Sequence, residues 1–213
     1  MHDVTISRAP PSSPSTPVAL LLRLPLSNPT EMLKRTMSSS DGKSYTQVLD
    51  FWFSPKSSPD YLQQKPFWYG GPADDAYVRK NLEPSYIDAK NGRLDCWMDL
   101  ANGEGALALI LLLDQVPRNI FRGSPDAYAT DARAVAVARH AVEKGWDRDL
   151  PGIQRRYLYS PFNHSESLQD QEMSVRLFTE LGDPYHLRWA RDFHDQIKRD
   201  GRFTHRDGIL GRR

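Results

Sequence analysis

The stretch that decides the fold reads GALALILLLDQ and covers residues 105–115. It is apolar on every side, which is typical of a helix buried at the centre of a protein. A buried strand could show a similar run, but its length, its alanines and the helical patterns on either side favour a helix. We expect Pro117 to end this helix, because the residue before a proline avoids the α region.

Helical patterns continue outward in both directions from this segment. The expected helices cover residues 45–53, 74–90, 124–144, 151–159, 166–181 and 183–198. Asp183-Pro184 is a typical helix start and Gly182 a typical helix end, whereas Pro84 should kink or split the helix that contains it. Strand signals are nearly absent, so the sequence predicts an all-α fold, an antiparallel helical bundle or solenoid.

The loop over residues 55–72 is rich in aromatic side chains. They are Tyr61, Phe67, Trp68 and Tyr69. So many aromatic rings in a loop of Pro, Ser and Gly predict that the loop folds back onto the core.

Three polar clusters follow apolar helical segments. They read DQVPRNIFR over residues 114–122, PFNHSE over 161–166 and GRFTHRD over 201–207. Each mixes acidic, basic and amide groups where a plain loop would need only Gly, Pro or Ser. Burying such groups is costly unless they are paired. We therefore expect the three clusters to pair with one another and to form one polar site.

The motifs at these clusters resemble the family known as domain of unknown function 924. The matching stretches are VLDFWF at 48–53, LDCW at 94–97, LLLDQVPRNIFRG at 111–123, SPFNHSE at 160–166 and GRFTHR at 201–206, with Gln171 and His194. The resemblance runs from Tyr45 to Arg213 and implies an all-helical fold similar to tetratricopeptide-repeat domains. It implies no activity, because the family is named for having none assigned. No internal repeat of the length typical of such domains is visible, so the solenoid rests on the resemblance alone.

The two ends of the chain predict its domain organisation. Residues 44–213 should form a single helical domain, and the Pro- and Ser-rich residues 1–43 a disordered leader. That leader reads either as a targeting segment or as the product of a start assigned too early, with Met37 as the true start. The resemblance implies a further helix after Gly211, where this chain ends. We expect a shortened C-terminus that partly exposes the apolar stripe of the last helix, formed by Leu187, Ala190 and Ile197, and promotes self-association through this face.

The candidate catalytic residues are His164, Glu166 and Asp114. Histidine titrates near neutral pH and suits general acid–base chemistry, with Glu166 as its companion at a helix start. Asp114 would act as an acid or base or would orient His164. The alternative is structural: a capping arrangement for His164 and an ion pair that fastens the loop for Asp114.

The candidate ligand-binding residues are mostly cationic, and a guanidinium suits carboxylate or phosphate. They are Arg118, Asn119, Arg122, His194, Arg202, His205 and Arg206. Arg118 and Arg122 would clamp an anion, and the cluster at 201–207 would complete its pocket. His194 shares a helix face with apolar residues and should point inward. The alternative makes these residues structural partners of carboxylates and helix ends.

Composition narrows the function classes. The chain of 213 residues has a net charge of +1, which indicates neither nucleic-acid nor membrane binding. Cys96 is the sole cysteine, so no intramolecular disulfide can form, and a reducing compartment, the cytoplasm, is favoured, with a mitochondrion left open by the leader. No apolar run is long enough to span a bilayer, and no cofactor motif or zinc spacing is present. We expect neither a metal nor a cofactor.

Two functions stay open from the sequence. The first is a pocket that binds or acts on a small anionic molecule, with the enzyme question undecided. The second is a protein-interaction scaffold similar to tetratricopeptide-repeat domains, in which the same polar residues are structural. A pocket would gather these side chains around a cavity, whereas a scaffold would pair them internally beside an exposed groove.

Overall fold

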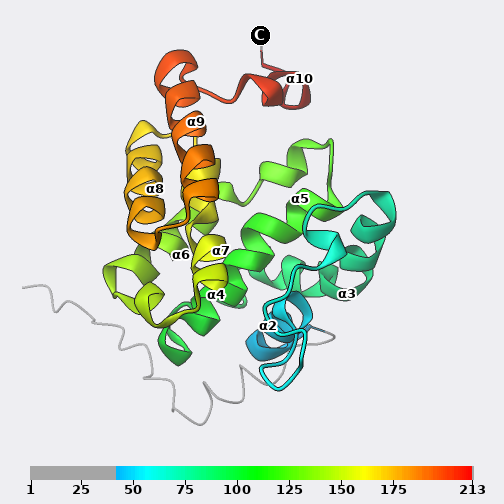
Figure 1. The fold of residues 1–213 in the computed structure, drawn as a ribbon. Helices are drawn as coiled ribbons and strands as arrows, with labels where there is room; N and C mark the ends of the chain where they lie inside the picture. The colour runs from blue at the N-terminus through cyan, green and yellow to red at the C-terminus, as the bar shows by residue number, and fades with distance from the viewer. Residues whose placement is uncertain (1–41, 213) are drawn as a thin grey trace, which may run out of the picture.

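Helix α4 (Glu104–Ile110) and the two helical segments that follow it occupy the centre of the fold. The computed structural model describes residues 42–212, which are all-helical and contain no strand (Figure 1). Residues 106–113 are completely buried. Helix α4 packs against α2 (Tyr45–Phe53), α6 (Asp131–Glu143) and α7 (Gly152–His164). The all-α prediction is confirmed, while the likeness to tetratricopeptide repeats stays a prediction.

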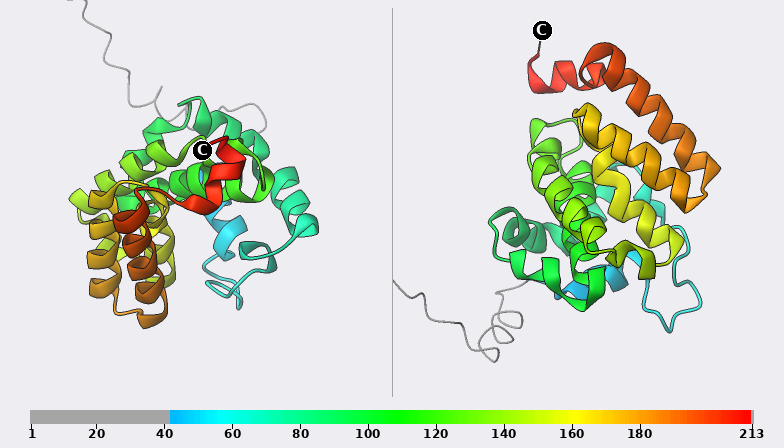
Figure 2. Two further views of the ribbon diagram at one scale, coloured as in Figure 1. Left: turned by 90° about the horizontal axis from the view of Figure 1, so that it is seen from above. Right: turned by 90° about the vertical axis from the view of Figure 1, so that its left-hand side faces the viewer.

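The other elements surround this centre. The longer helices are α3 (Pro72–Lys90), α8 (Leu168–Leu181) and α9 (Pro184–Asp200), and α5 (Val116–Ile120) and α10 (Asp207–Leu210) are short. Single turns are η1 (Pro66–Trp68), η2 (Asp95–Asp99), η3 (Ala101–Gly103), η5 (Pro125–Tyr128), η6 (Trp146–Asp149) and η7 (Thr204–Arg206). Helices α7, α8 and α9 pack in succession on one side, and α3 packs on α5 on the other (Figures 1 and 2).

The central helix does not end at Pro117, contrary to the prediction. A π-helical turn, η4 (Leu111–Gln115), follows α4, and the chain stays helical through Ile120. The N–H of Val116 bonds to the carbonyl of Leu111, five residues back. The wider turn places Pro117 at the start of α5, where the N–H that proline lacks is not needed.

Two other helix boundaries also differ from the prediction. Pro84 neither ends nor divides α3, which runs unbroken to Lys90 and buries Val78 and Leu82. Helix α7 continues past Tyr159 to His164 despite Pro161, with Phe162 fully buried. In both helices the burial of a packed face offsets the hydrogen bond that a proline removes. His164 therefore lies in the last turn of α7, and not at the start of the next helix.

The segment predicted as one helix over 124–144 is divided. The turn η5 comes first, capped by Ser124, and α6 begins only at Asp131. Thr130, between them, donates its hydroxyl to the carbonyl of Leu113 at 2.5 Å. This bond holds the residue between η5 and α6 against the central helical segment.

Helix α9 presents a different face from the one expected to be exposed. Ala190 and Ile197 of the predicted stripe are buried, because α9 packs along α8. The exposed apolar side chains of α9 are instead Tyr185 and Trp189. In the aromatic loop, Phe67 and Trp68 are buried in the core as predicted and Tyr61 packs against it, whereas Tyr69 is exposed, contrary to the prediction.

The predicted leader, residues 1–43, lies outside the described residues except for its last two positions. There the N–H of Lys43 bonds to the hydroxyl of Ser85 in α3. None of the helices in residues 42–212 is both long and apolar enough to cross a membrane.

Candidate functional site

Asp114 lies at the centre of a polar cluster and is completely buried. Its Oδ1 is 2.8 Å from Nδ1 of His164 and 3.1 Å from Nη1 of Arg118. Its Oδ2 accepts hydrogen bonds from Ser160 and Gln115 at 2.9 and 2.6 Å. Burial opposes ionisation, but the charge of Arg118 and the contact with His164 outweigh it and hold the pKa of Asp114 well below its ordinary value.

The ionised Asp114 determines the orientation of His164. Because a carboxylate only accepts, the Nδ1 of His164 donates to it. The other ring nitrogen, Nε2, has no partner among residues 42–212 that would compete with a ligand. A carboxylate that holds one imidazole nitrogen in this way leaves the other one ready to accept or donate a proton.

A second carboxylate joins the last of the three clusters to this centre. Asp131 accepts two parallel hydrogen bonds from Arg118, both 2.9 Å long. Arg206 lies 3.5 Å from the same carboxylate and donates to the carbonyl of His164 at 3.0 Å. The clusters at 114–122, 161–166 and 201–207 therefore meet in space.

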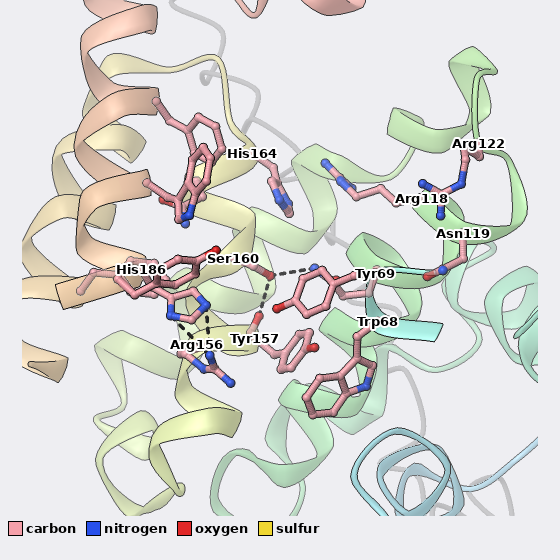
Figure 3. Close-up of a pocket in the computed structure, with 16 residues that line it drawn as sticks. Trp68, Tyr69, Arg118, Asn119, Arg122, Arg156, Tyr157, Ser160, His164 and His186 are labelled. Atoms are coloured by element: carbon pink, nitrogen blue, oxygen red, sulfur yellow. Dashed lines mark hydrogen bonds between the residues drawn. The ribbon is translucent and has the colours of Figure 1, made fainter. Parts of the chain in front are cut away.

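A cavity of about 600 Å³ opens beside this centre (Figure 3). Helices α5, α7 and α9 and the turn η1 contribute to its walls. Its basic or titratable lining residues are Arg118, Arg122, Arg156, His164 and His186, and its aromatic ones are Trp68, Tyr69, Tyr157, Phe178, Tyr185, Trp189 and Phe193. Ser160, Asn163, Gln115 and Asn119 complete the lining, which contains no Asp or Glu.

A second Asp–His pair lies on the α9 side of this cavity. The Nδ1 of His186 is 2.7 Å from Asp183, and its Nε2 is 3.0 Å from Nη1 of Arg156 (Figure 3). Burial and the charge of Arg156 lower the pKa of His186, against the pull of Asp183. His186 and Arg156 are not among the site residues predicted from the sequence. The i, i+3 spacing of His186 from the helix cap Asp183 was the available signal.

A smaller cavity of about 310 Å³ lies toward the C-terminal segment. Its lining residues are Arg118, Arg122, Gly123, Ala127, Tyr128, Asn163, His164, Phe193, Phe203, His205 and Arg206. It too has no carboxylate in its lining. Five of these side chains also line the larger cavity: Arg118, Arg122, Asn163, His164 and Phe193.

Some predicted site residues line a cavity but already have protein partners. Asn119 donates to the carbonyl of Phe67 and to Asp75, at 3.0 and 3.1 Å. Arg122 forms two hydrogen bonds to the same carboxylate of Asp75, at 2.7 and 2.8 Å. Both side chains therefore fasten α5 to α3 and η1.

Four predicted site residues line neither cavity: Asp114, which is buried behind the larger one, and Glu166, His194 and Arg202. Glu166 accepts from the N–H of Phe203 and from Arg212 instead of contacting His164. It differs from the expectation because it lies in the loop after α7 and faces the C-terminal segment. His194 pairs with its neighbour Asp195 near the surface, and Arg202 pairs with Asp207. Within residues 42–212, no group of three or more His, Cys, Asp or Glu side chains is arranged to hold a metal ion.

Comparison with known proteins supports the family resemblance. A family model described as a bacterial protein of unknown function, DUF924, matches residues 48–213. The solved structure of the protein of unknown function ATU0120 from Agrobacterium tumefaciens is 36% identical, covers 79% of this chain and 90% of its own, and superposes with a TM-score of 0.69. No curated protein matches the chain. Since the family model spans most of the sequence, the chain belongs to the DUF924 family.

Proposed function

We propose that the protein binds a small organic anion in the larger cavity and that His164 exchanges a proton with it. The proposal rests on the guanidinium of Arg156, which lacks a carboxylate partner among the described residues. Its guanidinium lines the cavity and forms no ion pair with a carboxylate in the part of the chain that the structure describes. Its hydrogen-bond partner is the imidazole of His186.

The other two arginines of the cavity already have carboxylate partners. Arg118 is already paired with Asp131, and Arg122 with Asp75. Arg156 has only an imidazole whose other nitrogen is held by Asp183. A planar guanidinium with free donors suits a carboxylate or phosphate oxygen, and the lining contains no acidic group that would repel one.

The aromatic walls indicate the rest of the ligand. Tyr69, Tyr185 and Trp189 are exposed to 70%, 65% and 40%, so they are free to contact a bound molecule. A volume of about 600 Å³ is typical of small-molecule sites, which span roughly 300–1,000 Å³ and are mostly apolar. An anion with an aromatic or other apolar body fits this combination.

The chemistry that the site offers is proton transfer. Asp114 holds the ring of His164, and Ser160 and Gln115 hold the carboxylate in turn. Such a supported imidazole acts as a general acid or base when a reacting group lies within hydrogen-bond reach.

The second candidate is an interaction scaffold in which the same charges are structural. The pairing of Arg118 with both Asp114 and Asp131 favours it, because this arginine is satisfied without a ligand. A scaffold does not require that an anion binds at Arg156. A binding experiment at this residue therefore separates the two functions.

Calorimetric titration of the full chain with benzoate and with uncharged benzamide tests the proposal. We expect benzoate to bind more tightly than benzamide. Arg156→Gln should weaken benzoate about ten-fold or more, as the loss of a charged hydrogen bond implies. Arg176→Gln, on the exposed surface of α8, is the matched control and should leave binding unchanged. Equal binding of the two probes, or full benzoate binding by Arg156→Gln, would refute the pocket and favour the scaffold.

A further inference from the structure

The smaller cavity contains an arginine whose pairing is incomplete. Arg206 is 6% exposed, and its Nε has no hydrogen-bond partner among the described residues. Its guanidinium carbon lies 4.6 Å from the ring centre of Tyr128 and 4.4 Å from that of Phe203. The nearest carboxylate, Asp131, is 3.5 Å away and already accepts two hydrogen bonds from Arg118. A buried cation is normally paired more completely than this.

Two further arginines and a histidine lie around Arg206. Arg118, Arg122 and His205 line the same cavity, and no carboxylate lines it. Burial and the charge of Arg118 lower the pKa of Arg206, although Asp131 opposes them. A bound anion would offset both effects, because it would place negative charge and hydrogen-bond acceptors beside the guanidinium.

The size of the cavity and its neighbours indicate which anion. Several arginines around one space suit the oxygens of a phosphate group. The volume of about 310 Å³ leaves room for more than an inorganic ion. His164, Asn163 and Phe193 line both cavities, so a group bound beside Arg206 lies next to the larger cavity.

We infer that the smaller cavity is a phosphate subsite and that the ligand is an organic phosphate. Its phosphate group would lie beside Arg206 and His205, and the rest of the molecule would extend past His164 into the larger cavity. The second half of this inference rests on the proposed function, whereas the phosphate subsite stands on the smaller cavity alone.

Calorimetric titration with inorganic phosphate at fixed ionic strength tests the subsite. His205→Glu adds a negative charge at an exposed side chain that lines the smaller cavity and should weaken phosphate binding about ten-fold or more. Thr204→Glu makes the same addition of charge on the adjacent exposed residue, outside both cavities, and should weaken it much less. Arg206→Lys, which keeps the charge but loses the planar fork, should also weaken phosphate.

Phenyl phosphate tests the connection between the cavities. We expect it to bind more tightly than inorganic phosphate, and Trp189→Ala to remove this advantage without changing inorganic phosphate. If His205→Glu and Thr204→Glu weaken phosphate equally, or phosphate does not bind, the subsite is refuted even where benzoate binds as proposed. If the binding of inorganic phosphate depends on His205 but phenyl phosphate binds no more tightly than inorganic phosphate, the subsite stands and the organic phosphate is refuted. Loss of benzoate binding alone refutes the proposed function and leaves the phosphate result standing.

Discussion

At the scale of single residues, Asp114 is expected to contribute strongly to stability. It is completely buried, and its carboxylate contacts two side chains that carry or can carry positive charge, Arg118 and His164. Removing one partner of a buried ion pair leaves the other without compensation. The residue therefore stabilises the cluster whether or not a ligand binds.

Asp114→Ala should lower the free energy of unfolding by about 3–5 kcal/mol, the usual loss when a buried pair is broken. The measurement is urea unfolding at neutral pH. Asp195→Ala is the matched control, because Asp195 is an exposed partner of His194, and it should change stability little. Equal effects of the two substitutions would show that the buried cluster contributes no more than a surface pair.

His186 should make stability depend on pH. Burial and Arg156 lower its pKa below the ordinary value of 6.5, so the unfolded chain binds more protons than the folded one near that pH. Stability from the neutral imidazole is present above pH 6.5 and is lost as the pH falls below it. Unfolding measured between pH 7.5 and 5.5 should therefore show a shallower loss for His186→Gln than for the wild type. His205, whose pKa is also lowered, titrates in both proteins and cancels in this comparison. A loss of equal steepness in both proteins would contradict the prediction.

At the scale of elements, the π-helical turn η4 positions the site. It lies between α4 and α5 and contains Asp114, and Arg118 follows one turn later in α5. Arg118 donates to the backbone carbonyl of Asp114 as well as contacting its carboxylate. π-Helical turns of this kind occur frequently at functional sites. The position of Asp114 then depends on how α4 is seated.

Gly105 seats the start of α4 against the turn η2. A Cβ on Gly105 would lie 2.3 Å from the carbonyl oxygen of Trp97 and 2.9 Å from Cβ of Leu100. Gly105→Ala should therefore destabilise the protein by about 1–3 kcal/mol, as overpacking does. Gly208→Ala, in α10, would meet nothing within 4 Å and should cause no loss. Urea midpoints measure both, and a Gly105→Ala protein as stable as the wild type would show that α4 can move away from η2.

At the scale of the whole molecule, the C-terminal segment forms one wall of the smaller cavity. Residues 201–212 run from α9 across to α10, on the side of α5 and η5 (Figure 2). Glu166 holds this segment through the N–H of Phe203 and the side chain of Arg212. Phe203, His205 and Arg206 of the segment line the cavity. Glu166 is thus placed to position this wall.

Glu166→Ala should raise amide hydrogen exchange in residues 203–212, because it removes both contacts with the α7–α8 loop. It should also weaken the binding of inorganic phosphate, since the positions of His205 and Arg206 would no longer be fixed. Glu172→Ala, on the exposed side of α8, is the control and should change neither. Unchanged exchange in Glu166→Ala would show that the segment is held by other contacts.

Self-association through the C-terminal face also stays a prediction at this scale. Ala190 and Ile197 of the stripe that first suggested it are buried, but Tyr185 and Trp189 of α9 are exposed and line the larger cavity. Exposed apolar groups of this kind favour association. Sedimentation at several concentrations should show the average mass rising, and less so for Trp189→Ser. A constant monomer mass would exclude association in this range.

The sequence by itself determined the helical class and indicated that the three polar clusters meet. The apolar run at 105–115 can only be buried, and Gly182, Asp183 and Gly201 end or begin helices through local backbone geometry. The cost of burying unpaired charges was enough to predict that Asp114, Arg118 and His164 meet.

Only the tertiary structure decided which partner each polar side chain takes. Glu166 lies two residues from His164 but pairs with Arg212, 46 positions away. His186 and Arg156, 30 positions apart, face one cavity because α7 and α9 lie together. Packing likewise decided that the central helix continues beyond Pro117. Helix propensity depends on near neighbours in the chain, whereas pairing and burial depend on distant segments that only the folded chain brings together.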